Sequence, residues 1–173
     1  VALDVICPSF QALDTFVASP TVPKSLLAFD RITNPQNVGM IIRSAVAAGI
    51  DGVVYPKRGI ASLGPLVIKA SAGTIFRAPL ISCDTTLSAL KLLKASGFRV
   101  AILDANAAGS IYDLNGREPT ICVLGGESHG ISSEVRALAD TSLSVPMANG
   151  VESLNVAVTA SLVAFQMARR AQP

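Results

Sequence analysis

The chain has 173 residues, which is enough for one domain that buries a sizeable hydrophobic core. Apolar residues make up 50% and charged residues 15%, a balance that excludes an intrinsically disordered chain and favours a well-buried α/β body. The formal net charge of +2 is too small to indicate a polyanionic partner by itself. A nucleic acid would therefore have to be held by local arginines or by an attached domain.

The cysteines and the apolar runs indicate a cytoplasmic protein without a membrane span. Cys7, Cys83 and Cys122 are odd in number and have no metal-ligand or C-x-x-C spacing, so reduced thiols are expected. The longest apolar run, 156–164, is well short of the roughly 20 residues that a membrane helix needs. No cluster of His, Cys and carboxylates predicts a metal site.

Residues 1–24 differ in pattern from the rest of the chain. They contain a strand-like segment at 2–6, a helical turn or two at 10–17, and then Ser19-Pro20-Thr21-Val22-Pro23, which has the composition of a linker. We expect the tail of a preceding domain here, with a native edge strand as the alternative.

From Leu26 onward, apolar strands alternate with helices. Fully apolar strands in such an alternation predict an α/β fold with a mostly parallel sheet and helices on both faces. Strands are predicted at 26–29, 52–55, 74–80, 99–103, 120–124 and 143–145, and helices from 35 and at 66–71, 85–95, 133–138 and 153–170. Ligands of parallel sheets bind at the carboxyl ends of the strands. The loops after Asp30, Leu103, Leu124 and Val145 are therefore the candidate site.

The loop after the first of these strands leads into a helix that carries a notable arginine. Asn34 and Pro35 form a favourable N-cap and first-turn pair. Arg43 lies four residues after Gly39 on one helical face, where the missing side chain leaves room for the guanidinium or for a neighbouring backbone. Since burying an arginine beside Ile42 is costly unless it binds an anion, a functional Arg43 is favoured over a surface one.

The segment 145–156 combines an apolar strand end, a turn and a polar helix start. The turn contains Pro146, Asn149 and Gly150, and the helix is expected to begin around Ser153 and Asn155. A helix start offers N–H groups to a carboxylate or phosphate, whereas ordinary capping is the structural alternative for these two residues.

The segment Gly126-Glu127-Ser128-His129-Gly130 matches the G-x-S-x-G elbow of serine hydrolases. That chemistry needs a histidine base later in the chain, but the single histidine, His129, lies inside the elbow itself. A hydrolase is thus a minor alternative. The G-x-G-x-x-G and G-x-x-x-x-G-K-[ST] patterns are missing, which argues against dinucleotide-binding and P-loop proteins.

Three segments together resemble the motifs of the TrmH-like branch of the SPOUT class of S-adenosylmethionine-dependent RNA methyltransferases. They are Asn37-x5-Arg43, then Leu124-Gly125-Gly126-Glu127-x2-Gly130, and Pro146-Met147-x5-Ser153-Leu154-Asn155. The resemblance covers about 26–170. It implies a SPOUT fold with a deep C-terminal trefoil knot, which the ordinary rules of chain connection would not have predicted, and a homodimer.

The same resemblance implies the reaction and the residues that serve it. The activity would be methyl transfer to a ribose 2′-hydroxyl of tRNA or rRNA, with S-adenosylhomocysteine as product and no metal. The residues implied in catalysis are Arg43, Asn37, Glu127, Ser153 and Asn155. The residues implied in cofactor binding are Leu103, Gly125, Val145, Met147, Ser153, Leu154 and Asn155.

Two points stay open on the sequence. Residues 25–173 would be the catalytic domain and 1–24 a linker or the tail of a missing RNA-binding domain, so tight, selective RNA binding is not expected from this nearly neutral chain alone. A weak basic rim could form at Arg31, Lys57, Arg58, Arg77 and Arg117, although solvated surface charge is favoured for each residue singly. The alternative from another class is a knotted, non-catalytic assembly factor that binds RNA or cofactor.

Overall fold

The fold is built on one parallel sheet. The computed structural model describes residues 10–19, 25–114, 118–127 and 130–169. Within these ranges eight strands follow the order β1-β4-β3-β2-β7-β5-β8-β6, and every named pair is parallel. The strands are β1 Gln11–Ala12, β2 Ser25–Asp30, β3 Gly52–Pro56, β4 Leu80–Cys83, β5 Arg99–Leu103, β6 Gly109–Ser110, β7 Thr120–Gly125 and β8 Thr141–Ser144.

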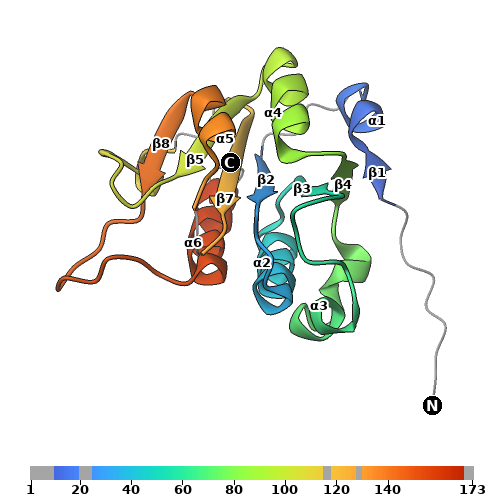
Figure 1. The fold of residues 1–173 in the computed structure, drawn as a ribbon, viewed down its shortest axis with the longest axis horizontal. Coiled ribbons are helices and arrows are strands. Elements are labelled where there is room, and N and C mark those ends of the chain that lie inside the picture. Colours follow the sequence, from blue (N-terminus) through green and yellow to red (C-terminus); the bar gives the residue numbers. More distant parts are fainter. Residues whose placement is uncertain (1–9, 20–24, 115–117, 128–129, 170–173) are drawn as a thin grey trace.

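The helices form a layer on each face of the sheet. They are α1 Leu13–Val17, α2 Pro35–Ala48, α3 Pro65–Ala70, α4 Thr86–Ala95, α5 Ser133–Leu138 and α6 Val156–Ala168, with short 3₁₀ helices η1 Thr74–Arg77 and η2 Ile111–Asp113. Figure 1 shows α2, α3 and α6 in its lower half and α1, α4 and α5 in its upper half.

Alternation along the strands divides the interior into two cores. In β2, Leu27 and Phe29 pack with α2, α3 and α6, whereas Leu26 and Ala28 pack with α1, α4 and α5. All four side chains are fully buried. The predicted α/β fold with helices on both faces is therefore confirmed, because strands covered twice need apolar residues at every position.

Most predicted elements are present, but one strand is wrong. Thr74–Arg77 form a 3₁₀ turn, and the strand begins only at Leu80. Gly73 adopts a left-handed φ of 76°, and the hydroxyl and N–H of Thr74 both donate to the Ser71 carbonyl. These local bonds override the strand propensity of Thr74 and Ile75. The short elements β6 and η2 were not predicted.

The first described residues of the chain contribute an edge strand and a short helix. Gln11 and Ala12 pair with β4, and Leu13 and Phe16 are buried. The predicted strand at 2–6 and most of the linker lie outside the described residues. The proposed boundary at residue 24 stays a prediction.

Gly39 is needed for the contact between two helices. A Cβ at this position would lie 2.6 Å from the Ala70 Cβ and 2.7 Å from the Val67 carbonyl oxygen on α3. The glycine therefore makes room for a neighbouring backbone, the second of the two roles considered for it, and α2 packs directly on α3.

Candidate functional site

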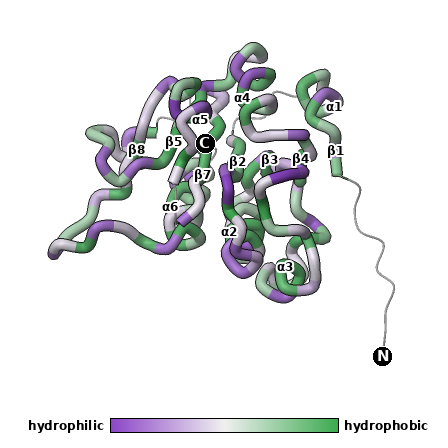
Figure 2. Tube along the Cα trace, in the orientation of Figure 1, coloured by the Kyte–Doolittle hydropathy of each residue, from purple (hydrophilic) through white to green (hydrophobic). Residues whose placement is uncertain are grey.

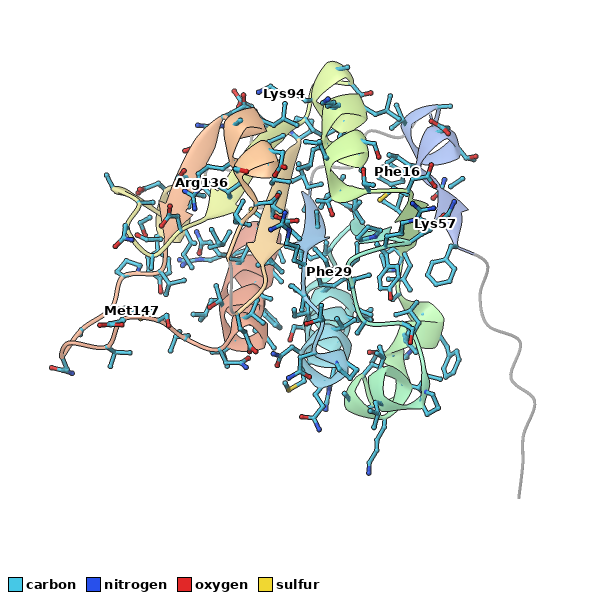
Figure 3. The ribbon with its side chains drawn as sticks, in the orientation of Figure 1. Phe16, Phe29, Lys57, Lys94, Arg136 and Met147 are labelled. Atoms are coloured by element: carbon cyan, nitrogen blue, oxygen red, sulfur yellow. The ribbon has the colours of Figure 1, made fainter. Side chains whose placement is uncertain are left out.

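The longest of the loops at the carboxyl edge connects β8 to α6. It runs outward and returns through a turn at 148–151, where the Val151 N–H donates to the Ala148 carbonyl. Asn149 and Gly150 adopt left-handed φ values of 56° and 74°. Figure 2 shows a hydrophilic tip, and Figure 3 shows Met147 on this loop, on the same side of the molecule as Arg136.

Helix α6 begins three residues later than predicted. Asn155 is its N-cap, and the Asn155 Oδ1 accepts the N–H groups of Ala157 at 2.8 Å and Val158 at 3.4 Å. Since the protein's own side chain occupies these donors, the helix start does not present them to an anion. Ser153 precedes the helix and is exposed.

Three polar side chains from distant segments form one cluster. The Asn37 Nδ2 donates to the Glu127 Oε1 at 2.5 Å. The Asn155 Nδ2 donates to the same oxygen at 3.1 Å and to the Asn37 Oδ1 at 3.2 Å. This Asn37–Glu127–Asn155 cluster joins the starts of α2 and α6 to the loop after β7. It brings together one predicted residue from each of the three motifs.

Glycines let the loop after β7 fold back tightly. A Cβ at Gly125 would lie 2.5 Å from the carbonyl carbon of Gly130, and a Cβ at Gly126 would lie 2.3 Å from the Arg31 carbonyl oxygen. The Gly130 N–H donates to the Gly126 carbonyl at 2.8 Å. Ser128 and His129, the residues of the hydrolase alternative, lie outside the described residues.

Most of the predicted cofactor residues line one pocket of about 250 Å³. Its walls come from the ends of β5, β7 and β8 and from the segment before α6, and we call it the donor pocket. Six of the seven predicted residues line it, namely Leu103, Gly125, Val145, Met147, Ser153 and Leu154. Asn155 is not among its lining residues, and its side chain caps α6.

An acidic residue of the donor pocket escaped the sequence analysis. Asp104 lines the pocket, and its carboxylate accepts the Asn106 N–H at 3.0 Å and pairs with the Arg136 guanidinium. The Asn106 N–H, and next the Arg136 side chain, hold the pKa of Asp104 below its usual range. Its position directly after a buried strand was the signal that could have identified it.

Arg43 lies outside the donor pocket of its own chain. It is exposed on α2 while its neighbours Ile42 and Ala45 are buried, and its side chain makes no hydrogen bond or ion pair with any described residue. The next residue, Ser44, has its hydroxyl 2.7 Å from that of Ser161. Ser44 thus lies on the side of α2 that borders α6, whereas Arg43 lies about 100° around the helix from it.

The described part of the chain has neither a candidate metal cluster nor a membrane-spanning helix. It contains no group of three or more His, Cys, Asp or Glu that could hold a metal ion. No helix in the same ranges is long and apolar enough to span a membrane.

Replacing Asn155 is expected to separate its two contributions. Asn155→Ala should lower the free energy of unfolding by about 1 kcal/mol or more, because it removes the cap and leaves the buried Asn37 with one partner fewer. Asn155→Ser keeps a capping oxygen and should recover most of the cap contribution. Urea unfolding measures both variants, and equal destabilisation by Ala and Ser would contradict the capping role.

The fold and the site together define a class of protein: a parallel α/β domain with a glycine-lined ligand pocket at the carboxyl edge of its sheet. Residues 24–165 match the model of the SpoU rRNA Methylase family. The chain belongs to this family.

Similar proteins support the membership. An uncharacterized tRNA/rRNA methyltransferase of Mycobacterium ulcerans is 38% identical over 98% of this chain and 56% of its own length. The chain thus spans about half the length of the curated relatives it matches. The SpoU methyltransferase AviRb of Streptomyces viridochromogenes, solved with AdoMet, has a TM-score of 0.79 at 28% identity, covering 88% of this chain and 62% of AviRb. A solved structure described as giving insights into the 2-OH methylation of C/U34 on tRNA has a TM-score of 0.72 at 30% identity. The match covers 84% of this chain and 95% of that chain.

Proposed function

We propose that this protein transfers a methyl group from S-adenosylmethionine to a ribose 2′-hydroxyl of tRNA or rRNA. The observation that carries the proposal is the convergence of the three motifs: the Asn37–Glu127–Asn155 cluster adjoins the donor pocket through Glu127, which belongs to both. Family membership supports methyl transfer to RNA. The relative that concerns 2-OH methylation supports the ribose hydroxyl as acceptor.

The donor pocket fits S-adenosylmethionine by its chemistry. Apolar side chains of Leu103, Val145, Met147 and Leu154 offer contact to an uncharged ring, and the glycine-rich backbone at Gly125 lets main-chain groups approach a ligand. When bound, this cofactor supplies a sulfonium methyl group that a hydroxyl oxygen attacks in line, leaving S-adenosylhomocysteine. AviRb, the relative solved with AdoMet, supports the same assignment.

The residues of the chain would orient the acceptor and stabilise its charge. Correct placement of donor and acceptor can contribute roughly 7 to 11 kcal/mol in well-oriented systems. Arg43 stabilises the developing alkoxide and grips a phosphate, because a guanidinium does not deprotonate in a protein. The hydroxyl proton passes to an RNA phosphate or to water. Asn37, Glu127, Ser153 and Asn155 position Arg43, the ribose and the cofactor.

Arg43 requires a second copy of the chain to reach a donor pocket. It is exposed on α2, which packs on α6, and the outer face of α6 carries the exposed apolar side chains Val158, Leu162 and Phe165. Exposed apolar residues at this helical spacing mark a contact surface, and a two-fold dimer would bury them. We propose that the homodimer buries this face and brings Arg43 of one protomer to the pocket of its partner.

Three further expectations belong to the same proposal. The C-terminal part of the fold is a trefoil knot, the protein acts in the cytoplasm, and residues 25–173 form the catalytic domain next to an RNA-binding domain.

Arg117 of the suggested basic rim lies outside the described residues. Arg31 and Arg58 are exposed, and Lys57 pairs with Asp84 at 2.9 Å.

The test is methyl transfer to total RNA by the full-length protein. Labelled S-adenosylmethionine should give labelled RNA, and mapping of ribose methylation in cells with and without the protein should identify one or a few nucleotides. Label on a base instead of a ribose would overturn the 2′-O assignment. Cofactor binding without transfer to any cellular RNA would favour a non-catalytic assembly factor.

A further inference from the structure

A second, larger pocket lies beside the donor pocket at the same edge of the sheet. Its volume is about 530 Å³, within the roughly 300–1,000 Å³ of small-ligand sites. The loops after β2, β3 and β7 and the start of α2 form it. The lining residues are Arg31, Ile32, Thr33, Asn34, Asn37, Gly59, Gly126 and Glu127.

The two pockets share a wall. Gly126 and Glu127 line both pockets, and Glu127 accepts a hydrogen bond from Asn37, which lines the second pocket. In-line methyl transfer requires the attacking oxygen about 3–3.5 Å from the methyl carbon, so the acceptor must occupy space directly next to the donor. The second pocket provides such space within the same protomer.

The lining of the second pocket is polar and offers donors to an anion. Arg31 contributes a guanidinium, Thr33 a hydroxyl and Asn34 an amide, all exposed to solvent. The partner of Arg31, Glu134, lies 4.0 Å away, and both side chains are more than half exposed. Such a pair is weak, and it leaves most of the five N–H donors of Arg31 available.

The backbone fixes Arg31 at the mouth of this pocket. Arg31 adopts a left-handed φ of 61°, which is uncommon for a residue other than glycine. The preceding Asp30 accepts the Gly126 N–H through its carbonyl at 2.9 Å and the Ser132 N–H through its carboxylate at 2.7 Å. Since Asp30 is buried, these bonds tie the Arg31 loop to the wall between the two pockets.

From this arrangement we infer that the second pocket is the subsite for the target nucleotide of the RNA, with a backbone phosphate of that nucleotide on Arg31. The inference rests on the proposed function and assigns a place to its acceptor. Arg31 then contributes to RNA affinity without contributing to cofactor affinity.

The experiment compares Arg31→Ala, Arg31→Lys and the charge-matched control Arg99→Ala in the full-length protein. Arg99 is exposed at the amino end of β5, at the opposite edge of the sheet. Binding of bulk tRNA and rRNA is measured over a range of salt concentrations, cofactor binding by calorimetry, and methyl transfer by label. Arg31→Ala should weaken RNA binding about tenfold or more and lower the slope of log affinity against log salt by about 1.

The remaining outcomes distinguish this subsite from the proposed function. Cofactor affinity should stay unchanged in all three variants, and Arg31→Lys should retain the salt slope because it keeps the charge. RNA binding by Arg31→Ala equal to that of Arg99→Ala overturns the subsite, as does an equal loss of cofactor binding. A wild-type protein that binds RNA with the expected Arg31 dependence but transfers no methyl group overturns the proposed function and leaves the subsite standing.

Discussion

Arg43→Ala is expected to lower the rate of methyl transfer by about 10²–10³-fold while cofactor binding survives. Removing one donor that stabilises a developing oxyanion has an effect of this size. Arg43 is exposed, so its loss should not unfold the chain, and it does not line the donor pocket of its own protomer. Single-turnover transfer and calorimetric cofactor binding measure the two quantities. Loss of both activities would assign Arg43 a structural role.

Mixed dimers test whether Arg43 acts on the partner's pocket. Leu154→Trp should fill the donor pocket, which Leu154 lines, and leave Arg43 intact. If Arg43 acts across the interface, a mixed dimer of Arg43→Ala and Leu154→Trp has one complete site. Equal mixing with random exchange should therefore restore about a quarter of wild-type activity. No recovery after verified exchange would mean that Arg43 acts within its own protomer.

The sequence indicated which residues would lie together but not how they would bond. The family resemblance implied that Asn37, Glu127 and Asn155 act together, and the structure brings them within hydrogen-bonding distance. The sequence could not show which atoms bond, because these residues are up to 118 positions apart. The resemblance implied a cofactor contact for Asn155, and the structure shows two bonds that the sequence did not predict, to the start of α6 and to Asn37.

Other features could not be predicted because they depend on individual hydrogen bonds that the residue pattern does not show. The alternation of apolar strands and helices was sufficient for the parallel sheet, since covered strands are apolar on both sides. The turn at Thr74–Arg77 could not be predicted from this alternation, because Thr74 and Ile75 have strand-forming side chains. Only the local hydrogen bonds of Thr74 to Ser71 favour the turn over a strand. The buried Asp30, which fixes the Arg31 loop, looked in sequence like the end of a strand.

Phe165→Asp is expected to dissociate the proposed dimer and with it to abolish most methyl transfer. Phe165 is 55% exposed on α6 and lines a further surface pocket, separate from the two described above, with Leu162, Gln166 and Tyr112. A carboxylate buried there without a partner would cost several kcal/mol in the interface but little in the isolated protomer, where it stays solvated. Sedimentation velocity should show a monomer with a native circular dichroism spectrum.

Leu66→Asp provides the matched control for this change. Leu66 is 58% exposed on α3, a helix that packs against α2. It is therefore not part of the outer face of α6. It loses the same kind of apolar surface and adds the same charge, so it should leave both the dimer and the activity intact. If Phe165→Asp remained dimeric and active at the same concentration, the α6 face would not be the interface. The proposal that this face brings Arg43 to the partner's pocket would then be wrong.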